Sequence, residues 1–296
     1  MIKLVFLGTA GAIPTKTRSL PSIAVEYNGK IYLFDCGEGT QRQFLKYNLN
    51  LSKVSCIFLS HIHADHIMGI PGLVRTLSIN KRTEPLYIYV HMSDKDKIKS
   101  LINFDGLLLN YEVIIKPIRT GTIIKNKDIE IDAFKLNHSV ITYGYIFKEL
   151  DKVRFIKNKA FAAGIKGKMF QELLKKKSLK IYNKEIKLKD ISYIKKGKKI
   201  AYATDTRPCK ITEKKAANAD ILIHEATYAD SLKTFAKQRK HSTTVEAANI
   251  ANNAHVKMLI LFHISARYKN TSKLLDETKA IFKNAEIAKD GLKIIL

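Results

Sequence analysis

Cysteine, long apolar runs and acidic side chains are all scarce in this sequence. The three cysteines among 296 residues, Cys36, Cys56 and Cys209, form no CxxC pair and leave an odd number. This usage argues against a disulfide framework and for a reducing compartment. No apolar stretch approaches the length of about 20 residues that a membrane-spanning helix requires. We therefore expect a cytoplasmic protein that is not embedded in a membrane.

The acidic residues number 27 against 52 lysines and arginines, which gives a formal net charge of +25. A field of this sign attracts polyanions and indicates a nucleic-acid partner. Compositional drift toward lysine, isoleucine and asparagine is an alternative explanation of the charge. The lysines are concentrated, however, in residues 149–189, where they interleave with phenylalanines. An inserted basic arm explains this segment better than a second domain does, and a solvated pair of helices that caps the core is the other interpretation.

Short strand-like runs dominate the chain, and its 46% of hydrophobic residues can form a large core. Apolar or alternating runs predict strands at 3–7, 22–27, 31–35, 55–59, 86–90, 112–116, 129–134, 143–147, 199–203, 221–224 and 258–262. Helices are expected at 40–47, capped by Thr40, and at 66–78, 93–104, 243–252 and 272–282. Because strands outnumber helices and many are hairpin neighbours, we predict an α/β fold, an αββα sandwich of two mixed β-sheets packed face to face with helices outside. This single domain would cover residues 1–296, with the arm inserted at 149–189.

The segment 60–66 (SHIHADH) carries four metal-binding side chains behind an apolar strand. Side chains alternate along a strand, so His61 and His63 point to the same side. The chain then turns, which lets Asp65 and His66 reach a neighbouring point. Two imidazoles for one ion, and a carboxylate and an imidazole for a second, suit a pair of divalent metal ions about 3.5–4 Å apart. A polar loop that contains histidines by chance is the alternative.

Two ions need more ligands than these four side chains supply. Three further candidates follow strand-like runs, namely His138, Asp205 and His263. Of these three, only Asp205 is a carboxylate, and it is therefore the residue placed to bridge both ions.

The order and spacing of these residues resemble the metallo-β-lactamase superfamily. The match is most specific for the tRNA 3′-processing endonucleases, the tRNase Z family, in their short form. Further motifs that resemble this family lie at 60–73 (SHIHADHIMGIPGL), 14–18 (PTKTR), 224–227 (HEAT), 241–243 (HST) and 263–268 (HISARY). The resemblance extends over nearly the whole chain, although Ser19 stands where the family usually has asparagine. It implies a metallo-β-lactamase-like fold.

The resemblance also implies the roles of the site residues. Two zinc ions, with manganese as the other metal considered, would be held by His61, His63 and His138 on one side and by Asp65, His66 and His263 on the other, with Asp205 between them. A hydroxide between the ions would attack the phosphorus, and Asp65, besides serving as a ligand, would accept the proton of the water that forms it. His241, oriented by Glu225, would protonate the departing 3′-oxygen. A structural ion pair for Glu225, and a place beside a helix cap for His241, are the alternatives.

Basic residues that we expect to contact RNA fall into two groups. Lys16, Arg18 and Arg267 are candidates for contacts with phosphates or with the 3′ end, although each could be an ordinary surface charge. In the arm, Lys166 and Lys168 lie in a segment that resembles the Gly-Pro motif of the family's exosite. Lys168 stands there in place of the proline.

The resemblance implies a zinc-dependent endoribonuclease that removes the 3′ trailer from precursor tRNA and leaves a 3′-hydroxyl on the tRNA. The arm would grip the folded elbow of the tRNA, and the enzyme would work as a homodimer. The alternative within this fold is a metallo-hydrolase of small phosphodiesters or of esters and thioesters. A non-catalytic RNA-binding relative is a third hypothesis, which the complete set of ligands disfavours.

Overall fold

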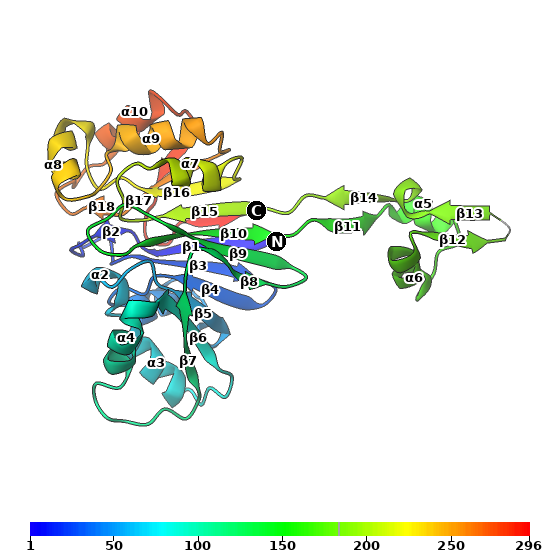
Figure 1. Cartoon of the computed structure of the whole chain (residues 1–296), viewed down its shortest axis with the longest axis horizontal. Coiled ribbons are helices and arrows are strands. Elements are labelled where there is room, and N and C mark those ends of the chain that lie inside the picture. Colours follow the sequence, from blue (N-terminus) through cyan, green and yellow to red (C-terminus); the bar gives the residue numbers. More distant parts are fainter. Residues whose placement is uncertain (183) are drawn as a thin grey trace.

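The computed structural model describes residues 1–182 and 184–296. The body of the protein consists of two seven-stranded β-sheets that pack face to face, with helices on both outer faces (Figure 1). This arrangement confirms the predicted αββα sandwich. Within the described residues, no helix is both long and apolar enough to cross a membrane.

The first sheet is mixed and has the strand order β20-β1-β3-β4-β5-β6-β7. Its strands are β1 (Ile2–Gly8), β3 (Ser22–Tyr27), β4 (Lys30–Phe34), β5 (Val54–Phe58), β6 (Leu86–His91), β7 (Val113–Ile118) and β20 (Lys293–Ile295). The pairs from β20 to β4 are antiparallel, whereas β4, β5, β6 and β7 run parallel. The carboxyl ends of these four strands therefore lie at one edge.

The second sheet has the strand order β19-β17-β16-β15-β10-β9-β8. Its strands are β8 (Gly121–Lys125), β9 (Ile129–Lys135), β10 (Tyr143–Glu149), β15 (Lys199–Ala203), β16 (Ile221–Glu225), β17 (Leu259–Phe262) and β19 (Ala285–Ile287). The pairs from β8 to β15 are antiparallel, and those from β15 to β19 are parallel. Each sheet thus joins an antiparallel half to a parallel half.

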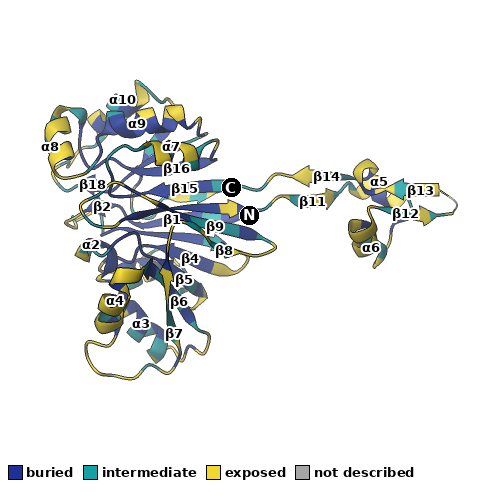
Figure 2. Cartoon of the chain, viewed as in Figure 1, coloured by how far each residue is buried: buried dark blue, intermediate teal, exposed yellow. Residues whose placement is uncertain are grey.

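Alternation along the strands distributes the apolar side chains over three layers. On β1, Leu4 and Phe6 point between the sheets, whereas Val5 and Leu7 point toward the helices of the first outer face. These helices are α1 (Thr40–Lys46), α3 (Ile70–Ile79) and α4 (Lys95–Ile102). The second outer face is covered by α7 (Lys210–Ala216), α9 (Thr244–Asn253) and α10 (Ser272–Lys279). Figure 2 shows dark blue, buried strands between helices with exposed outer faces.

Residues 152–195 leave the sandwich and form an arm (Figure 1). An antiparallel ribbon of β11 (Lys152–Phe155) and β14 (Ser192–Lys195) leads to its far end. The far end contains α5 (Lys157–Ala162), α6 (Met169–Lys176) and the hairpin of β12 (Ser178–Ile181) and β13 (Lys184–Lys187). A small separate core there consists of Ala160, Ile165, Leu173, Leu188 and Ile191. The arm therefore folds around its own apolar cluster.

Polar and close backbone contacts hold the root of the arm. Tyr27 donates a hydrogen bond of 2.9 Å to Glu149, and Lys152 donates to the Tyr27 hydroxyl at 3.0 Å. Lys152 also donates to Asp128 at 2.7 Å. Gly197 packs so tightly that a Cβ there would lie 1.9 Å from the Glu149 carbonyl oxygen. These contacts set the direction in which the arm leaves the sandwich.

The single helix expected at 66–78 is wrong, because the structure divides it into α2 (Ala64–Ile67) and α3. The Gly69 N–H between them donates to the Cys36 carbonyl at 2.8 Å instead of continuing a helix. A Cβ at Gly69 would lie 2.0 Å from the Gly37 carbonyl oxygen. The close approach of a neighbouring loop therefore ends α2 and requires glycine.

The expected cap at Thr40 is also wrong. Gly39 is the N-cap of α1, and the Thr40 hydroxyl instead donates to the Gly37 carbonyl at 2.7 Å. Several short strands were not predicted, namely β2 (Ala10–Gly11), β8, β18 (Ile264–Ser265), β19 and β20. Four of them have only two or three residues, too few to show a pattern, whereas β8 was missed although it pairs with the next strand, β9.

Candidate metal centre

Seven side chains with metal-binding groups meet at the ends of strands from both sheets. His61 and His63 follow β5, Asp65 and His66 lie on α2, His138 follows β9, Asp205 follows β15 and His263 follows β17. Because the two sheets pack face to face, these loops meet at one end of the sandwich.

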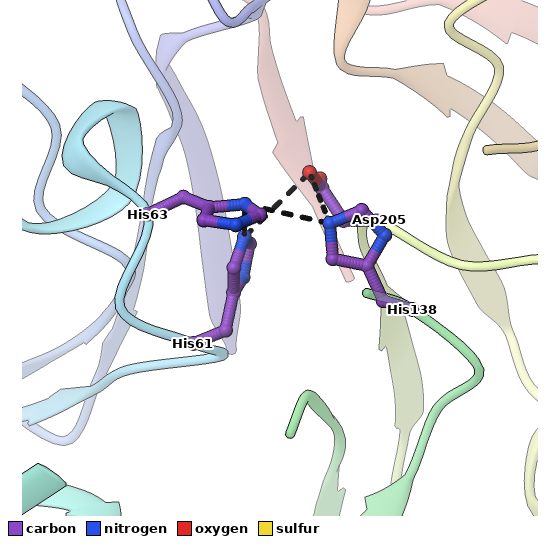
Figure 3. Close-up of side chains that lie close together, drawn as sticks. All are labelled: His61, His63, His138 and Asp205. Carbon is purple, nitrogen blue, oxygen red and sulfur yellow. Dashed lines mark hydrogen bonds and ion pairs between the residues drawn. The ribbon is translucent and has the colours of Figure 1, made fainter. Parts of the chain in front are cut away.

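The first cluster contains His61, His63, His138 and Asp205 (Figure 3). His61 Nε2 lies 2.9 Å from His63 Nδ1, which lies 3.4 Å from His138 Nε2. One oxygen of Asp205, Oδ2, is 3.6 Å from His61 Nε2 and 3.7 Å from His138 Nε2. All four ligand atoms lie within 4.8 Å of one another, which is close enough for one ion to contact them all.

The second cluster contains Asp65, His66 and His263. Asp65 Oδ2 lies 3.5 Å from His66 Nε2 and 3.4 Å from His263 Nε2, and it accepts a hydrogen bond of 2.9 Å from the Ala12 N–H. The other Asp205 oxygen, Oδ1, is 3.4 Å from His66 Nε2 and 3.2 Å from His263 Nε2. The two oxygens of Asp205 therefore face different clusters.

The chemistry of these donors fits a divalent metal. Imidazole nitrogens and carboxylate oxygens are the ligands that zinc and related divalent ions take in proteins. His66 Nε2 is fully buried and has no hydrogen-bond partner, although it points at two carboxylates. Burial raises the pKa of Asp205, but the neighbouring imidazoles of His263 and His66 lower it well below its usual range. Asp205 is therefore held as a carboxylate, the form that binds a cation.

A further carboxylate, that of Asp35, orients two of the ligands, His61 and His66, from the side away from the clusters. It accepts hydrogen bonds from His66 Nδ1 at 2.9 Å, from Tyr202 at 2.7 Å and from the Ser60 hydroxyl at 2.9 Å. The Ser60 oxygen lies 2.9 Å from His61 Nδ1 and can accept its proton in a hydrogen bond. Both rings thereby turn Nε2 toward the clusters. Such outer contacts fix the tautomer and orientation of a metal-binding histidine.

The histidines of the second sheet are oriented in the same way. His263 Nδ1 lies 2.9 Å from the Thr227 hydroxyl, and His138 Nδ1 lies 3.0 Å from the Lys240 carbonyl oxygen. Each Nδ1 thus has a partner outside the clusters, and each Nε2 faces the donors described above. His63 differs, because its Nδ1 faces the cluster.

Sequence reasoning missed Asp35, although a signal for it exists. Like Asp205, Asp35 is a carboxylate directly after a buried strand. Its backbone has a φ of 57°, which is uncommon for a residue with a side chain. This conformation at the end of β4 accompanies a fully buried side chain that contacts both sheets.

Glu225, which is buried, and His241, which is half-buried, form a hydrogen-bonded pair beside the second cluster. His241 Nδ1 lies 2.9 Å from Glu225 Oε1, and Glu225 also accepts hydrogen bonds from the Thr206 N–H at 2.8 Å and the Thr227 hydroxyl at 2.7 Å. Burial lowers the pKa of His241, but the charge of Glu225 and their hydrogen bond raise it to about 9. Burial raises the pKa of Glu225, and His241 lowers it to about 2. Without bound ions, the imidazole is therefore charged at neutral pH.

A cleft of about 540 Å³ opens beside the clusters. Five of the donors line it, namely His63, Asp65, His138, Asp205 and His263. The other lining residues are mainly polar, basic or aromatic: Ala12, Ser139, Tyr228, Phe235, Gln238, Arg239, Lys240, His241 and Arg267. Larger hollows of about 670 and 740 Å³ lie along the arm and beside β9, and none of the seven donors lines either. The cleft is therefore the approach to the candidate metal centre.

The predicted RNA contacts are spread over three places. Lys16 is exposed on the loop that precedes β3, and Arg267 is exposed in the cleft. Arg18 is turned inward, where its guanidinium donates to the Thr9 hydroxyl at 2.7 Å. Lys166 and Lys168 are exposed between α5 and α6, in the arm and away from the clusters (Figure 1). The arm residues therefore do not belong to the cleft.

Comparison with known proteins identifies one family model and several relatives that each cover nearly the whole chain. The family model described as Anti-Pycsar protein Apyc1 matches residues 2–285. Ribonuclease Z of Methanothermobacter thermautotrophicus is 37% identical over 296 residues, which cover 99% of this chain and 96% of the relative. Ribonuclease Z of Archaeoglobus fulgidus is 38% identical over 300 residues, covering 99% and 97%.

Two solved structures have a similar fold. The short form of human tRNase Z has a TM-score of 0.73 and 25% identity, covering 99% of this chain and 98% of that one. The metallo-β-lactamase fold protein YhfI of Bacillus subtilis has the same TM-score at 19% identity, with coverage of 99% and 98%. These likenesses confirm the predicted metallo-β-lactamase-like fold.

Replacing Asp35 with asparagine tests the support of the metal ligands. The amide would place its NH₂ group either against the Ser60 N–H or against His66, Tyr202 and the Ser60 hydroxyl, so a donor would face a donor and the network that orients the rings would be disturbed. We expect D35N to bind zinc about 10- to 100-fold more weakly, as measured by competition with a chelator. D220N, which changes a buried carboxylate just before β16, should keep the affinity. An unchanged affinity in D35N would show that Asp35 does not support the ligands.

Proposed function

The chain belongs to the ribonuclease Z family, and we propose that it is a two-metal endoribonuclease that removes the 3′ trailer of precursor tRNA. The tRNA would keep a 3′-hydroxyl. The observation that carries this proposal is the position of Asp205, whose two oxygens face two separate groups of ligands. The cleft beside them is lined by His241 and by several cationic side chains, which suit an RNA phosphodiester as substrate.

The seven donors would hold two zinc ions, and manganese is an alternative because ligand type alone does not select between them. His61, His63 and His138 would serve one ion, Asp65, His66 and His263 the other, and Asp205 both. Bound there, the ions would supply a water of lowered pKa and offset the negative charge on the phosphate.

The chain's own residues would handle the two protons of the reaction. Asp65, held by the Ala12 N–H at 2.9 Å, is placed to accept the proton of the attacking water. His241 would donate the second proton from Nε2 to the departing 3′-oxygen, because its Nδ1 is already committed to Glu225. Glu225 touches no substrate in this account and positions His241.

The basic arm would bind the folded body of the tRNA. Residues 156–191 contain eleven lysines and three acidic residues, a net charge of +8. Both Lys166 and Lys168 are exposed there. Contacts of this kind recognise the phosphate backbone and the shape of a folded RNA and not its sequence.

The position of the arm supports a homodimer. Strand β10 begins at Tyr143, whose N–H donates to the Ser60 carbonyl beside the ligands, and ends at Glu149 at the root of the arm. Seven residues of strand separate these two points by about 20 Å. The arm then extends further from that end of the sandwich (Figure 1). We infer that the arm of one subunit presents tRNA to the metal centre of its partner, in the cytoplasm.

The ligand clusters alone would equally suit a metallo-hydrolase of small phosphodiesters, esters or thioesters. Such an enzyme would not need the arm or a net charge of +25. These two features favour a large RNA as the substrate.

Replacing His241 with alanine tests its role as a proton donor. We expect cleavage of precursor tRNA to fall about 10²- to 10⁴-fold, because the 3′-oxygen leaves poorly without a proton. Hydrolysis of bis(p-nitrophenyl) phosphate should fall much less, because nitrophenolate leaves without one. Metal content should not change. Equal loss of both activities, or loss of metal, would instead indicate that His241 binds metal.

Shortening the arm tests the tRNA exosite. Phe155 pairs with Ser192 across the ribbon, so a glycine-containing turn can replace residues 156–191 without disturbing β11 and β14. We expect kcat/KM for precursor tRNA to fall at least about tenfold, because many phosphate contacts are lost. The hydrolysis of bis(p-nitrophenyl) phosphate should persist. Parallel loss of both activities would contradict an exosite.

A further inference from the structure

Four side chains form a stacked wall on one side of the cleft. Two come from the segment around α8 (Lys233–Gln238), namely Phe235 and Arg239. Arg267 lies over the rings of Tyr228 and Phe235, with its guanidinium carbon 4.8 and 5.2 Å from their centres. The Arg239 guanidinium lies 5.4 Å from the centre of the Phe235 ring. We call this set the cation–aromatic wall.

The inner side of the wall is packed, and its outer side is exposed. The rings of Tyr228 and Phe235 meet edge to face, with centres 5.3 Å apart and planes at 84°. Tyr228 is buried and Phe235 is half-buried, whereas Arg239 and Arg267 are exposed. Arg267 is also held by a hydrogen bond of 3.0 Å from its Nε to the Ser265 hydroxyl. The rings therefore support two guanidinium groups that are accessible from the cleft.

The wall lies next to the proton donor and takes no part in holding metal. The ring centres of Tyr228 and His241 are 5.9 Å apart. All four side chains of the wall line the same cleft as His241, and none of them belongs to the seven donors. Helix α8 lies at the end of the sandwich away from the arm (Figure 1). The wall therefore faces RNA near the scissile bond and not the folded body of the tRNA.

We propose that the cation–aromatic wall is a stacking site for an unpaired nucleobase. The base belongs to the nucleotide that retains the 3′-hydroxyl, because His241 beside the wall protonates the oxygen of that nucleotide. This inference rests on the proposed function and adds a base-binding site to it. Unpaired bases in RNA stack on aromatic rings and on the planes of arginine guanidinium groups.

Stacking explains why arginine and not lysine occupies both positions. A guanidinium is planar and can lie flat on a ring while its other face receives a base, whereas an ammonium is a point charge without such a face. Every base has a π-face, so the site accepts any nucleotide. Such tolerance suits an enzyme that processes precursors with different bases at the cleavage site.

An abasic ribonucleotide at this position of a precursor tRNA tests the site. In the wild-type enzyme, removal of the base should lower kcat/KM about 5- to 150-fold, the usual effect of one stacked base. In R239A and F235A the intact precursor should be cleaved more slowly, and removal of the base should then have little further effect. Coupling of this kind in a double-mutant cycle shows that the base and the side chain interact.

Three controls separate stacking from other effects. K237A removes a charge from the exposed surface of α8 outside the cleft and should behave like the wild type. R239K keeps the charge without the plane and should behave like R239A. Thermal unfolding and zinc content identify a variant that has lost its fold. If F235A has lost it, the comparison depends on R239A, because Arg239 is exposed.

Two results would overturn the inference. Independent effects of the abasic nucleotide and of R239A would show that the base does not contact the wall. Wild-type behaviour of R239K would show a contact with phosphate in place of the base. Failure of the wild-type enzyme to cleave the intact precursor would instead contradict the proposed function itself, before any variant is compared.

Discussion

The carboxylate of Asp205 is the group on which the arrangement of the site depends. It is buried between imidazoles, with one oxygen toward His61 and His138 and the other toward His66 and His263. Because His61 and His66 follow strands of one sheet, while His138, Asp205 and His263 follow strands of the other, the distance between the sheets sets the distance between the donors. A buried carboxylate surrounded by imidazoles is stabilised most when cations occupy the space between them. The fold and the proposed chemistry are thus linked through one side chain.

Hydrogen bonds outside the clusters make this arrangement specific. Asp35 orients His66 directly and His61 through Ser60. Thr227 contacts His263 and also donates to Glu225, so the ligand and the proton donor share one network. Displacement of a ligand would therefore also disturb the proton donor, which makes the two halves of the proposed reaction dependent on each other.

Local patterns in the sequence predicted the sandwich and singled out the side chains that the structure brings together. The alternation of His61 and His63 and the places of His138, Asp205 and His263 after strands are both local features. Features that depend on tertiary contacts were not predictable in this way. The break at Gly69 is caused by the approach of Gly37. Asp35 follows a buried strand as Asp205 does, but its contacts with Tyr202 and His66 form only in the folded protein. Phe235 and Tyr228 carry no local signal, since the role proposed for them follows from the arginines that lie over their rings.

The central claim is that two cations occupy the space on either side of Asp205. Anomalous X-ray scattering at the zinc edge, from crystals of the zinc-loaded protein, locates such ions directly. We predict two peaks about 3.5–4 Å apart, one toward His61, His63 and His138 and the other toward Asp65, His66 and His263. A single peak, or peaks away from Asp205, would contradict the account.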